Sequence, residues 1–229
     1  MINAHPRTDL LRQVEASTGT PLPAPSEQEL HILKCAMRCF ASHGFAATSV
    51  RAIAAEAGVT GPMINYYFEG KEPLYRRLVL LVSQAMQERL MLAAEPEGSL
   101  RERLRRVMHA YVDFATESPD AVVLFFAAAY GPTEGRPEID IGAIRDGGQV
   151  ALARVLDEGV ERGDFVLRAG YEVKDLFELC LAALVHVIGR EVTSGFPRDA
   201  ARNARMKAEL DRMAFVILEG ISARTGASA

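Results

Sequence analysis

The sequence predicts an all-α protein of about nine helices, and three observations lead to this fold class. Apolar residues recur at helical spacing through most of the 229-residue chain. No segment shows the sustained period-two alternation with β-branched residues that is typical of a strand. Glycine and proline clusters divide the chain into segments of helical length, three short ones first and long ones after. The predicted helices cover residues 26–43, 48–56, 61–67, 71–93, 99–117, 119–130, 138–162, 171–193 and 200–223.

Composition and charge narrow the class of protein further. A hydrophobic content of 49% with 24% charged residues is ordinary for a folded globular protein. The net charge of −4 predicts no general affinity for polyanions, so any contact with nucleic acid has to be local. Three cysteines without a CxxC pair, the lack of an apolar N-terminal run and the shortness of all apolar runs predict a cytoplasmic protein with no membrane segment.

The first predicted helix has a clear start and a clear end. Residues 1–25 finish in TGTPLPAP, which cannot form a continuous helix, so they are predicted to be a flexible N-terminal extension. Ser26 and Glu29 then form a capping-box pattern, which predicts the start of the helix over 26–43. Gly44 is a suitable residue for the turn that ends it.

The next two helices are short and are joined by a tight turn. Thr48 is a good N-cap for the first of them, and Gly58 is placed where a left-handed residue is needed to end it. Thr60 can cap the second helix, in which Ile64 and Phe68 share the inward face. Two short helices with a glycine-containing turn, packed on a longer helix, indicate a helix-turn-helix at residues 49–68.

The outward face of the second short helix suits DNA. Small and polar residues there let the backbone approach base edges in the major groove, while tyrosine hydroxyls and a lysine suit phosphate oxygens. The competing interpretation is that Tyr66 and Tyr67 are ordinary half-buried aromatics and that Lys71 is a solvated lysine.

Residues 26–86 resemble the DNA-binding domain of the TetR (tetracycline-repressor) family of transcription regulators. The residues that carry the resemblance are Gly44-Phe45, Thr48-Ser49-Val50, Ile53-Ala54, Ala57-Gly58-Val59-Thr60, Ile64, Tyr67-Phe68, Lys71-Glu72 and Leu74. The resemblance implies a DNA-binding domain at 26–86 and a ligand-binding and dimerisation domain at 87–229. It also implies a repressor that binds double-stranded operator DNA and is released by a small molecule.

The resemblance also assigns roles to single residues. It implies phosphate contacts from Thr48, Tyr66, Tyr67 and Lys71. It implies contacts to bases, or close to them, from Ser49, Arg51, Gly61, Pro62, Met63 and Asn65. Asn65 departs from the family pattern, since most members have a tyrosine there, and asparagine can bond adenine in a bidentate manner.

The last two predicted helices are apolar over more than one face. One face can pack inward, and the second needs cover, which predicts a homodimer through 171–193 and 200–223. Burial within one subunit is the alternative. The residues assigned to this interface are Leu176, Leu184, Ile188, Met213 and Ile217.

A pocket for a small, largely apolar effector is expected among the C-terminal helices. The aromatic content of 99–117 and 119–130 supports an apolar site with a few polar groups, although plain core packing would explain each residue singly. The candidate pocket residues are His109, Phe114, Phe125, Phe126, Tyr130 and His186.

Two other classes of function compete with a ligand-responsive regulator. The sequence disfavours an enzyme, because it contains no phosphate-binding glycine loop, HExxH or GxSxG motif, and no cofactor is implied. A redox- or metal-responsive regulator would use Cys35 and Cys39, which lie one helical turn apart. A disulfide within one helix has poor geometry and no set of metal ligands completes a site, so two buried apolar residues are the preferred interpretation.

Overall fold

The computed structural model describes residues 24–131, 135, 137–139, 141–164, 166–194 and 200–221, so the predicted extension lies outside them except for residues 24 and 25. The described residues form nine helices and no strand, which confirms the predicted fold class. The helices are α2 (Glu27–Ala47), α3 (Val50–Glu56), α4 (Gly61–Phe68), α5 (Lys71–Ala93), α6 (Leu100–Glu117), α7 (Pro119–Tyr130), α8 (Ile141–Glu161), α9 (Val173–Thr193) and α10 (Ala200–Ile221).

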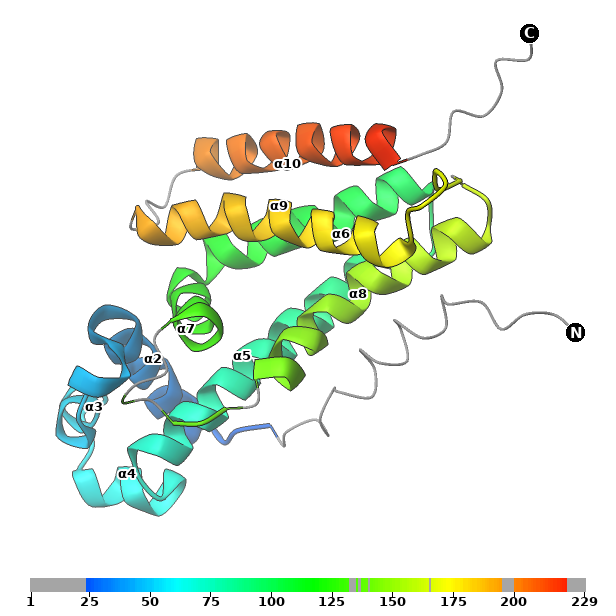
Figure 1. Cartoon of the computed structure of the whole chain (residues 1–229). Helices are drawn as coiled ribbons and strands as arrows, with labels where there is room; N and C mark the ends of the chain where they lie inside the picture. Colours follow the sequence, from blue (N-terminus) through cyan, green and yellow to red (C-terminus); the bar gives the residue numbers. More distant parts are fainter. Residues whose placement is uncertain are drawn as a thin grey trace, which may run out of the picture.

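Helices α2, α3 and α4 form a small bundle at one end of the molecule (Figure 1). The capping box is present: the Glu29 amide donates to Ser26 Oγ at 3.3 Å, and the Ser26 amide donates to Glu29 Oε2 at 2.9 Å. Gly44 has a φ of +76° and interrupts α2 near its end. Ile53 of α3 and Ile64 of α4 are fully buried in the shared core. This packing holds two helices that would be marginal alone in water.

Helix α5 joins this bundle to the rest of the chain. It has 23 residues, which corresponds to a length of about 35 Å. Figure 1 shows it running diagonally from α4 into the larger helical part, with α8 packed along it. Helix α7 makes a second connection, because it packs directly against α2. The predicted boundary between residues 86 and 87 therefore lies inside one continuous helix.

A buried arginine joins α5, α6 and α8. Arg103 of α6 is only 1% exposed, and its Nη2 lies 2.9 Å from the Ala94 carbonyl at the end of α5. The same atom lies 2.9 Å from Glu158 Oε2 of α8. Burial tends to raise the pKa of Glu158, but hydrogen bonds from Arg154 and Arg103 outweigh it, and the net pKa is lowered. The carboxylate is thus held in its charged form between three helices.

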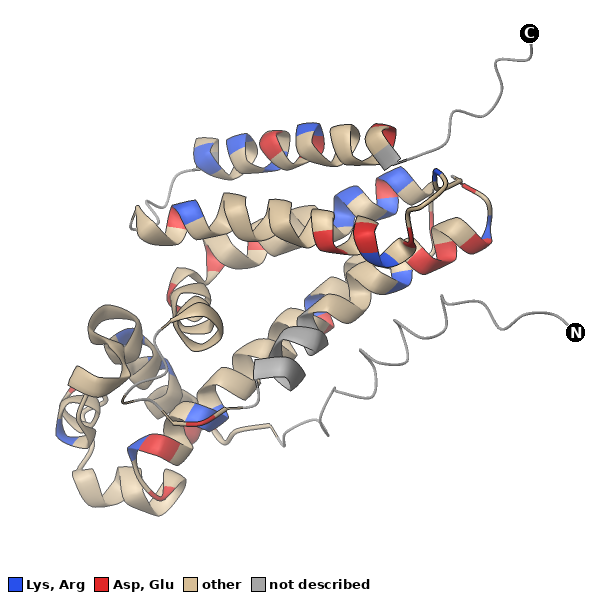
Figure 2. Cartoon of the chain, in the orientation of Figure 1, with Lys and Arg blue, Asp and Glu red and all other residues tan. Residues whose placement is uncertain are grey.

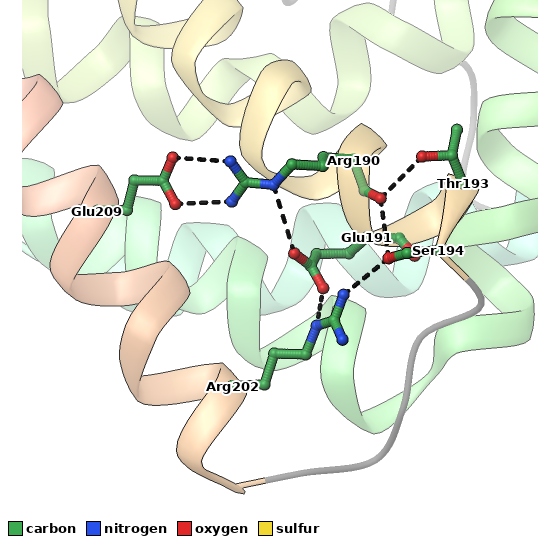
Figure 3. A network of polar contacts seen from close by, with 6 residues as sticks. All are labelled: Arg190, Glu191, Thr193, Ser194, Arg202 and Glu209. Atoms are coloured by element: carbon green, nitrogen blue, oxygen red, sulfur yellow. Dashed lines mark hydrogen bonds and ion pairs between the residues drawn. The ribbon is translucent and has the colours of Figure 1, made fainter.

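Helices α9 and α10 lie side by side in opposite directions, and a polar network holds them at one end (Figure 3). Arg190 makes two hydrogen bonds to Glu209, at 3.1 and 2.7 Å. Glu191 is buried and pairs with Arg202, which also donates to Ser194 Oγ at 2.7 Å. A buried carboxylate is stable only with such partners, so this network fixes the packing of α10 on α9.

Of the helices that the structure describes, none combines the length and apolar character needed to cross a bilayer.

Candidate functional site

The turn between α3 and α4 has the geometry that the sequence predicts. Gly58 has a φ of +62°, and the Val59 amide donates to the Ala54 carbonyl at 3.0 Å, which closes the end of α3. Pro62 lies in the first turn of α4, where a backbone N–H would have no carbonyl partner within the helix. Thr60 occupies the N-cap position, although its side chain makes no capping hydrogen bond. The two helices are therefore fixed mainly by packing and by the turn.

Thr48 corrects one prediction. Ser49 is the N-cap of α3, and its Oγ accepts from the Ala52 amide at 3.1 Å. Thr48 is 3% exposed, and its hydroxyl lies 2.7 Å from the Gly44 carbonyl and 3.2 Å from that of Cys39. A hydroxyl enclosed in this way has no access to DNA. Thr48 instead closes the broken end of α2.

Helix α4 presents one buried and one exposed face. Ile64 and Phe68 are buried, whereas Pro62, Asn65 and Tyr66 are exposed, Tyr66 by 81%. The remaining candidates of this helix, Gly61, Met63 and Tyr67, are half-buried. Figure 2 shows α4 free of charge along its length, with charged residues on α3 and at the start of α5. The exposed face of α4 offers hydrogen-bonding and apolar groups to a partner, and it carries no charged side chain.

Two tyrosines and a lysine stand at the far end of α4. The rings of Tyr66 and Tyr67 are 5.1 Å apart at 80°, so Tyr67 supports the more exposed Tyr66. Lys71 Nζ donates to the Phe45 carbonyl at 3.0 Å and lies 4.1 Å from the centre of the Phe45 ring. This lysine therefore ties the start of α5 to the end of α2, a role that the sequence did not suggest. An ammonium has three donors, so two remain for other acceptors.

Half of the six Lys and Arg side chains on α2, α3 and the first turns of α5 are held in ion pairs. The pairs are Arg38 with Glu56, Arg76 with Glu72 and Arg77 with Glu29. Of the other three, all within the described residues, Arg51 and Lys34 are exposed without an ion pair and Lys71 bonds the Phe45 carbonyl. Arg51 lies on α3, in the first turn after Ser49. The bundle thus has few cations available for a polyanion.

An apolar cavity of about 50 Å³ lies between α5, α6, α7, α8 and α9. Four of the six predicted pocket residues line it: Phe114, Phe125, Phe126 and Tyr130. Helix α9 contributes the apolar side chains Leu181, Leu184, Val185 and Ile188. The other described lining residues are Met86, Tyr111, Val122 and Gln149. Helical periodicity identifies the apolar ones as inward-facing, but nothing in the sequence marks Gln149 as part of this wall.

The two histidines that the sequence suggested for the pocket lie elsewhere. His109 Nε2 is 2.8 Å from Asp211 Oδ1, so this side chain joins α6 to α10. His186 is exposed on α9. Neither histidine lines this cavity, because each lies on the side of its helix that turns away from it.

Comparisons with known proteins place this geometry in a family. Residues 32–78 match the sequence model of the bacterial regulatory proteins of the tetR family. This match covers most of α2, all of α3 and α4 and the start of α5. Over these residues, the helix-turn-helix domain matches that of the TetR family. No curated protein matches the chain.

Solved structures of regulators share the fold of most of this chain. The fatty acid degradation regulator FadR from Bacillus halodurans is similar with a TM-score of 0.71 and 18% identity, over 86% of this chain and 97% of that one. FadR from Bacillus subtilis, solved in complex with stearoyl-CoA, is similar with a TM-score of 0.68 and 20% identity, over 84% of this chain and 98% of that one. PfmR from Thermus thermophilus, a TetR-family transcriptional regulator, has a TM-score of 0.63 and 24% identity, over 80% of this chain and 97% of that one. The similar structures are regulators and not enzymes.

The predicted dimer residues of this TetR-like chain require a correction. Leu176, Leu184 and Ile188 are buried within the single chain, and the last two line the cavity. Met213 and Ile217 are half-buried. The large apolar side chains that α9 and α10 leave exposed are Leu179, Phe215 and Val216. Both helices are apolar on two faces, as predicted, but the residues assigned to the outward face of α9 lie on its inward one.

The cysteines are packed as apolar residues. Cys35 is buried, its thiol lies 3.7 Å from the Glu56 carbonyl, and Arg38 donates to its sulfur at 3.2 Å. Burial raises the pKa of Cys39 and raises that of Cys180 to about 12, so both resist forming thiolates. Within the described residues no three His, Cys, Asp or Glu side chains are grouped as metal ligands.

Proposed function

We propose that this protein is a DNA-binding transcription regulator that reads the major groove with α4. The observation that carries the proposal is the division of α4 into a buried face and an exposed one. Ile64 and Phe68 fix the helix in the bundle. Pro62, Asn65 and Tyr66 are exposed on the opposite side of the helix, which would enter the groove. The residue pattern of the TetR family supports the same role, which the protein would carry out in the cytoplasm.

Ser49, Arg51 and the exposed residues of α4 are the proposed contacts to DNA. Ser49 and Arg51 are exposed at the start of α3. Asn65 is the candidate for reading a base, since its amide can both donate to and accept from adenine. Tyr66, Tyr67 and the remaining donors of Lys71 would meet phosphate oxygens and fix the register of the protein on the duplex.

We further propose that two subunits bind DNA together. One bundle offers few unpaired cations, so a single copy would bind weakly at physiological salt. Phe215 and Val216 on α10 and Leu179 on α9 provide exposed apolar surface. Figure 1 shows both helices in the part of the molecule away from α4. A symmetric pairing of these helices would cover that surface. The proposed homodimer thus uses α9 and α10, and its interface residues are the exposed Leu179, Phe215 and Val216.

The proposed switch is release of DNA by a small, largely apolar effector, which makes the protein a repressor. The cavity wall includes Met86 of α5 and Phe125 of α7. Helix α5 continues into the DNA-binding bundle, and α7 packs on α2 of that bundle. A ligand that separates these helices would therefore change the distance between two recognition helices, which must match a spacing of about 34–36 Å. The complex of Bacillus subtilis FadR with stearoyl-CoA supports an effector with a large apolar part.

Selection of binding sites from random DNA duplexes tests the main proposal. We expect the purified protein to enrich a two-fold symmetric site. The variant Asn65→Ala should lose discrimination at one base pair of each half-site, by about 1–3 kcal/mol, with little change in binding to unrelated DNA. Lack of any enriched sequence would refute the DNA-binding role. A specificity profile that is unchanged in the variant would refute the role of Asn65.

Lys71→Met separates phosphate binding from the structural role of this lysine. If Lys71 meets phosphate, a plot of log affinity against log salt should become shallower by about one per subunit, on any duplex. Lys174→Met, at an exposed position on α9, is the control and should leave the slope unchanged. A lower melting temperature with the slope of the wild type would show that Lys71 acts only through Phe45.

A further inference from the structure

Gln149 is a polar side chain in the wall of an otherwise apolar cavity. It lies on α8, is 5% exposed and lines the cavity together with aromatic and aliphatic residues. Its side-chain amide has no hydrogen-bond partner within the described part of the chain, and neither its nitrogen nor its oxygen is among the fully enclosed unpartnered atoms of that part. The amide is therefore open to a molecule in the cavity, and native structures usually bond such a group to water or to a bound molecule. The orphan amide therefore points to a polar group on whatever occupies the cavity.

The remaining wall sets the character of that occupant. Every described residue that lines the cavity is uncharged, so nothing among them would compensate a buried ionic group. Burial, and to a lesser degree the neighbouring Tyr130, raises the pKa of Tyr111, which therefore remains a neutral phenol. Tyr111 and Tyr130 already take part in interactions within the chain. Gln149 is then the group best placed to bond a ligand.

The size of the cavity sets the scale of the ligand group that it accepts. A volume of about 50 Å³ is several times the roughly 10–15 Å³ that a cavity needs to admit one water, so it accepts a small group of a ligand, on the order of one ring. The amide can donate through Nε2 and accept through Oε1, so a carbonyl or a hydroxyl oxygen fits it.

We propose that Gln149 determines specificity by selecting an uncharged, mainly apolar ligand that carries one carbonyl or hydroxyl oxygen. The inference rests on the proposal that this cavity is the effector site, and it adds the chemical class of the effector. A hydrocarbon leaves the amide unbonded, and a carboxylate brings a charge that the described wall does not neutralise. Both are rejected relative to a neutral oxygen compound of the same shape.

Three probes of similar size test this selectivity on the purified protein without DNA. Cyclohexanone carries a carbonyl oxygen, methylenecyclohexane replaces it with CH₂, and cyclopentanecarboxylate carries a charge. Dissociation constants are measured by ligand-observed NMR titration for the wild type and for Gln149→Met, which keeps the length of the side chain and removes the amide. Comparing the ratio of ketone to alkene affinity between the two proteins cancels the different costs of leaving water, because these costs do not depend on the protein.

We expect this ratio to fall by about threefold to tenfold in Gln149→Met, which corresponds to one neutral hydrogen bond. The ligand-free variant should melt at the same temperature as the wild type or a few degrees higher, because a polar group that no described residue bonds has been replaced by an apolar one in an apolar wall. Leu181→Met is the matched control, since it also changes the cavity wall and should leave the ratio unchanged.

An unchanged ratio in Gln149→Met would overturn the proposal, as would tighter binding of the carboxylate than of the ketone to the wild type. Failure of the ketone to bind at any soluble concentration would overturn it too. The effector role is tested separately, by adding the bound ketone to the protein–DNA complex. A shifted ratio without release of DNA would leave Gln149 as the selective residue and would refute the switch.

Discussion

Replacing Phe215 with glutamate should convert the proposed dimer into a monomer and weaken binding to the selected DNA site by at least about 100-fold. Phe215 is 59% exposed and Val216 is 67% exposed on α10, so both depend on a partner subunit for cover. In a symmetric interface the substitution would bury an unpaired carboxylate on each side. Such a charge costs about 3–5 kcal/mol, and about 1.4 kcal/mol is a factor of ten in affinity. Sedimentation velocity at micromolar concentration and a DNA titration measure the two effects.

Leu92→Glu is the control for this experiment. Leu92 is exposed on α5 and lies on neither α9 nor α10. The variant should therefore remain a dimer and retain its DNA affinity. Leu184→Glu differs again, because this residue is buried in the cavity wall and a charge there should lower the melting temperature of the subunit itself. A wild-type monomer, or a Phe215→Glu variant that still sediments as a dimer, would contradict the proposed interface.

Replacing Arg103 with alanine should lower the free energy of unfolding by about 3–5 kcal/mol. The guanidinium is buried and bonds both the Ala94 carbonyl and Glu158. Its removal leaves a cavity, an unbonded carbonyl at the end of α5 and a carboxylate with one partner fewer. The loss is a large part of the stability of an ordinary domain. Urea denaturation at one fixed protein concentration gives the value, since dimerisation would add a concentration dependence.

Arg101→Ala provides a comparison on the same helix. Arg101 also forms an ion pair, at 2.6 Å with Glu219, but both side chains are 54% exposed. Exposed pairs contribute less than about 1 kcal/mol, so this variant should unfold close to the wild type. If the two alanine variants lose the same stability, the buried contacts of Arg103 do not hold α5, α6 and α8 together.

The sequence was sufficient for the elements of the fold. The pairing of Ser26 with Glu29 places the start of α2, and Gly58 places the end of α3, because capping and left-handed turns depend on a few adjacent residues. Apolar spacing predicted the helices to within a few residues. The same local signals predicted the helix-turn-helix, together with the buried positions of Ile64 and Phe68.

The tertiary structure decided which face of each helix meets which neighbour. Periodicity shows that α9 has two apolar faces, but only packing shows that Leu184 lines a cavity and Leu179 is left outside. Thr48 is enclosed because the chain bends back at Gly44, which brings its hydroxyl to the Gly44 carbonyl and to that of Cys39 in α2.

Long-range partners are the second contribution of the tertiary structure. Lys71 bonds Phe45, which is 26 residues away, and His109 bonds Asp211, which is 102 residues away. Gln149 has its environment set by five different helices. The sequence by itself determined the helices, the capping box of α2 and the helix-turn-helix, since these depend on neighbours along the chain. The depth, lining and polarity of the cavity depend on side chains that come together only when the helices pack.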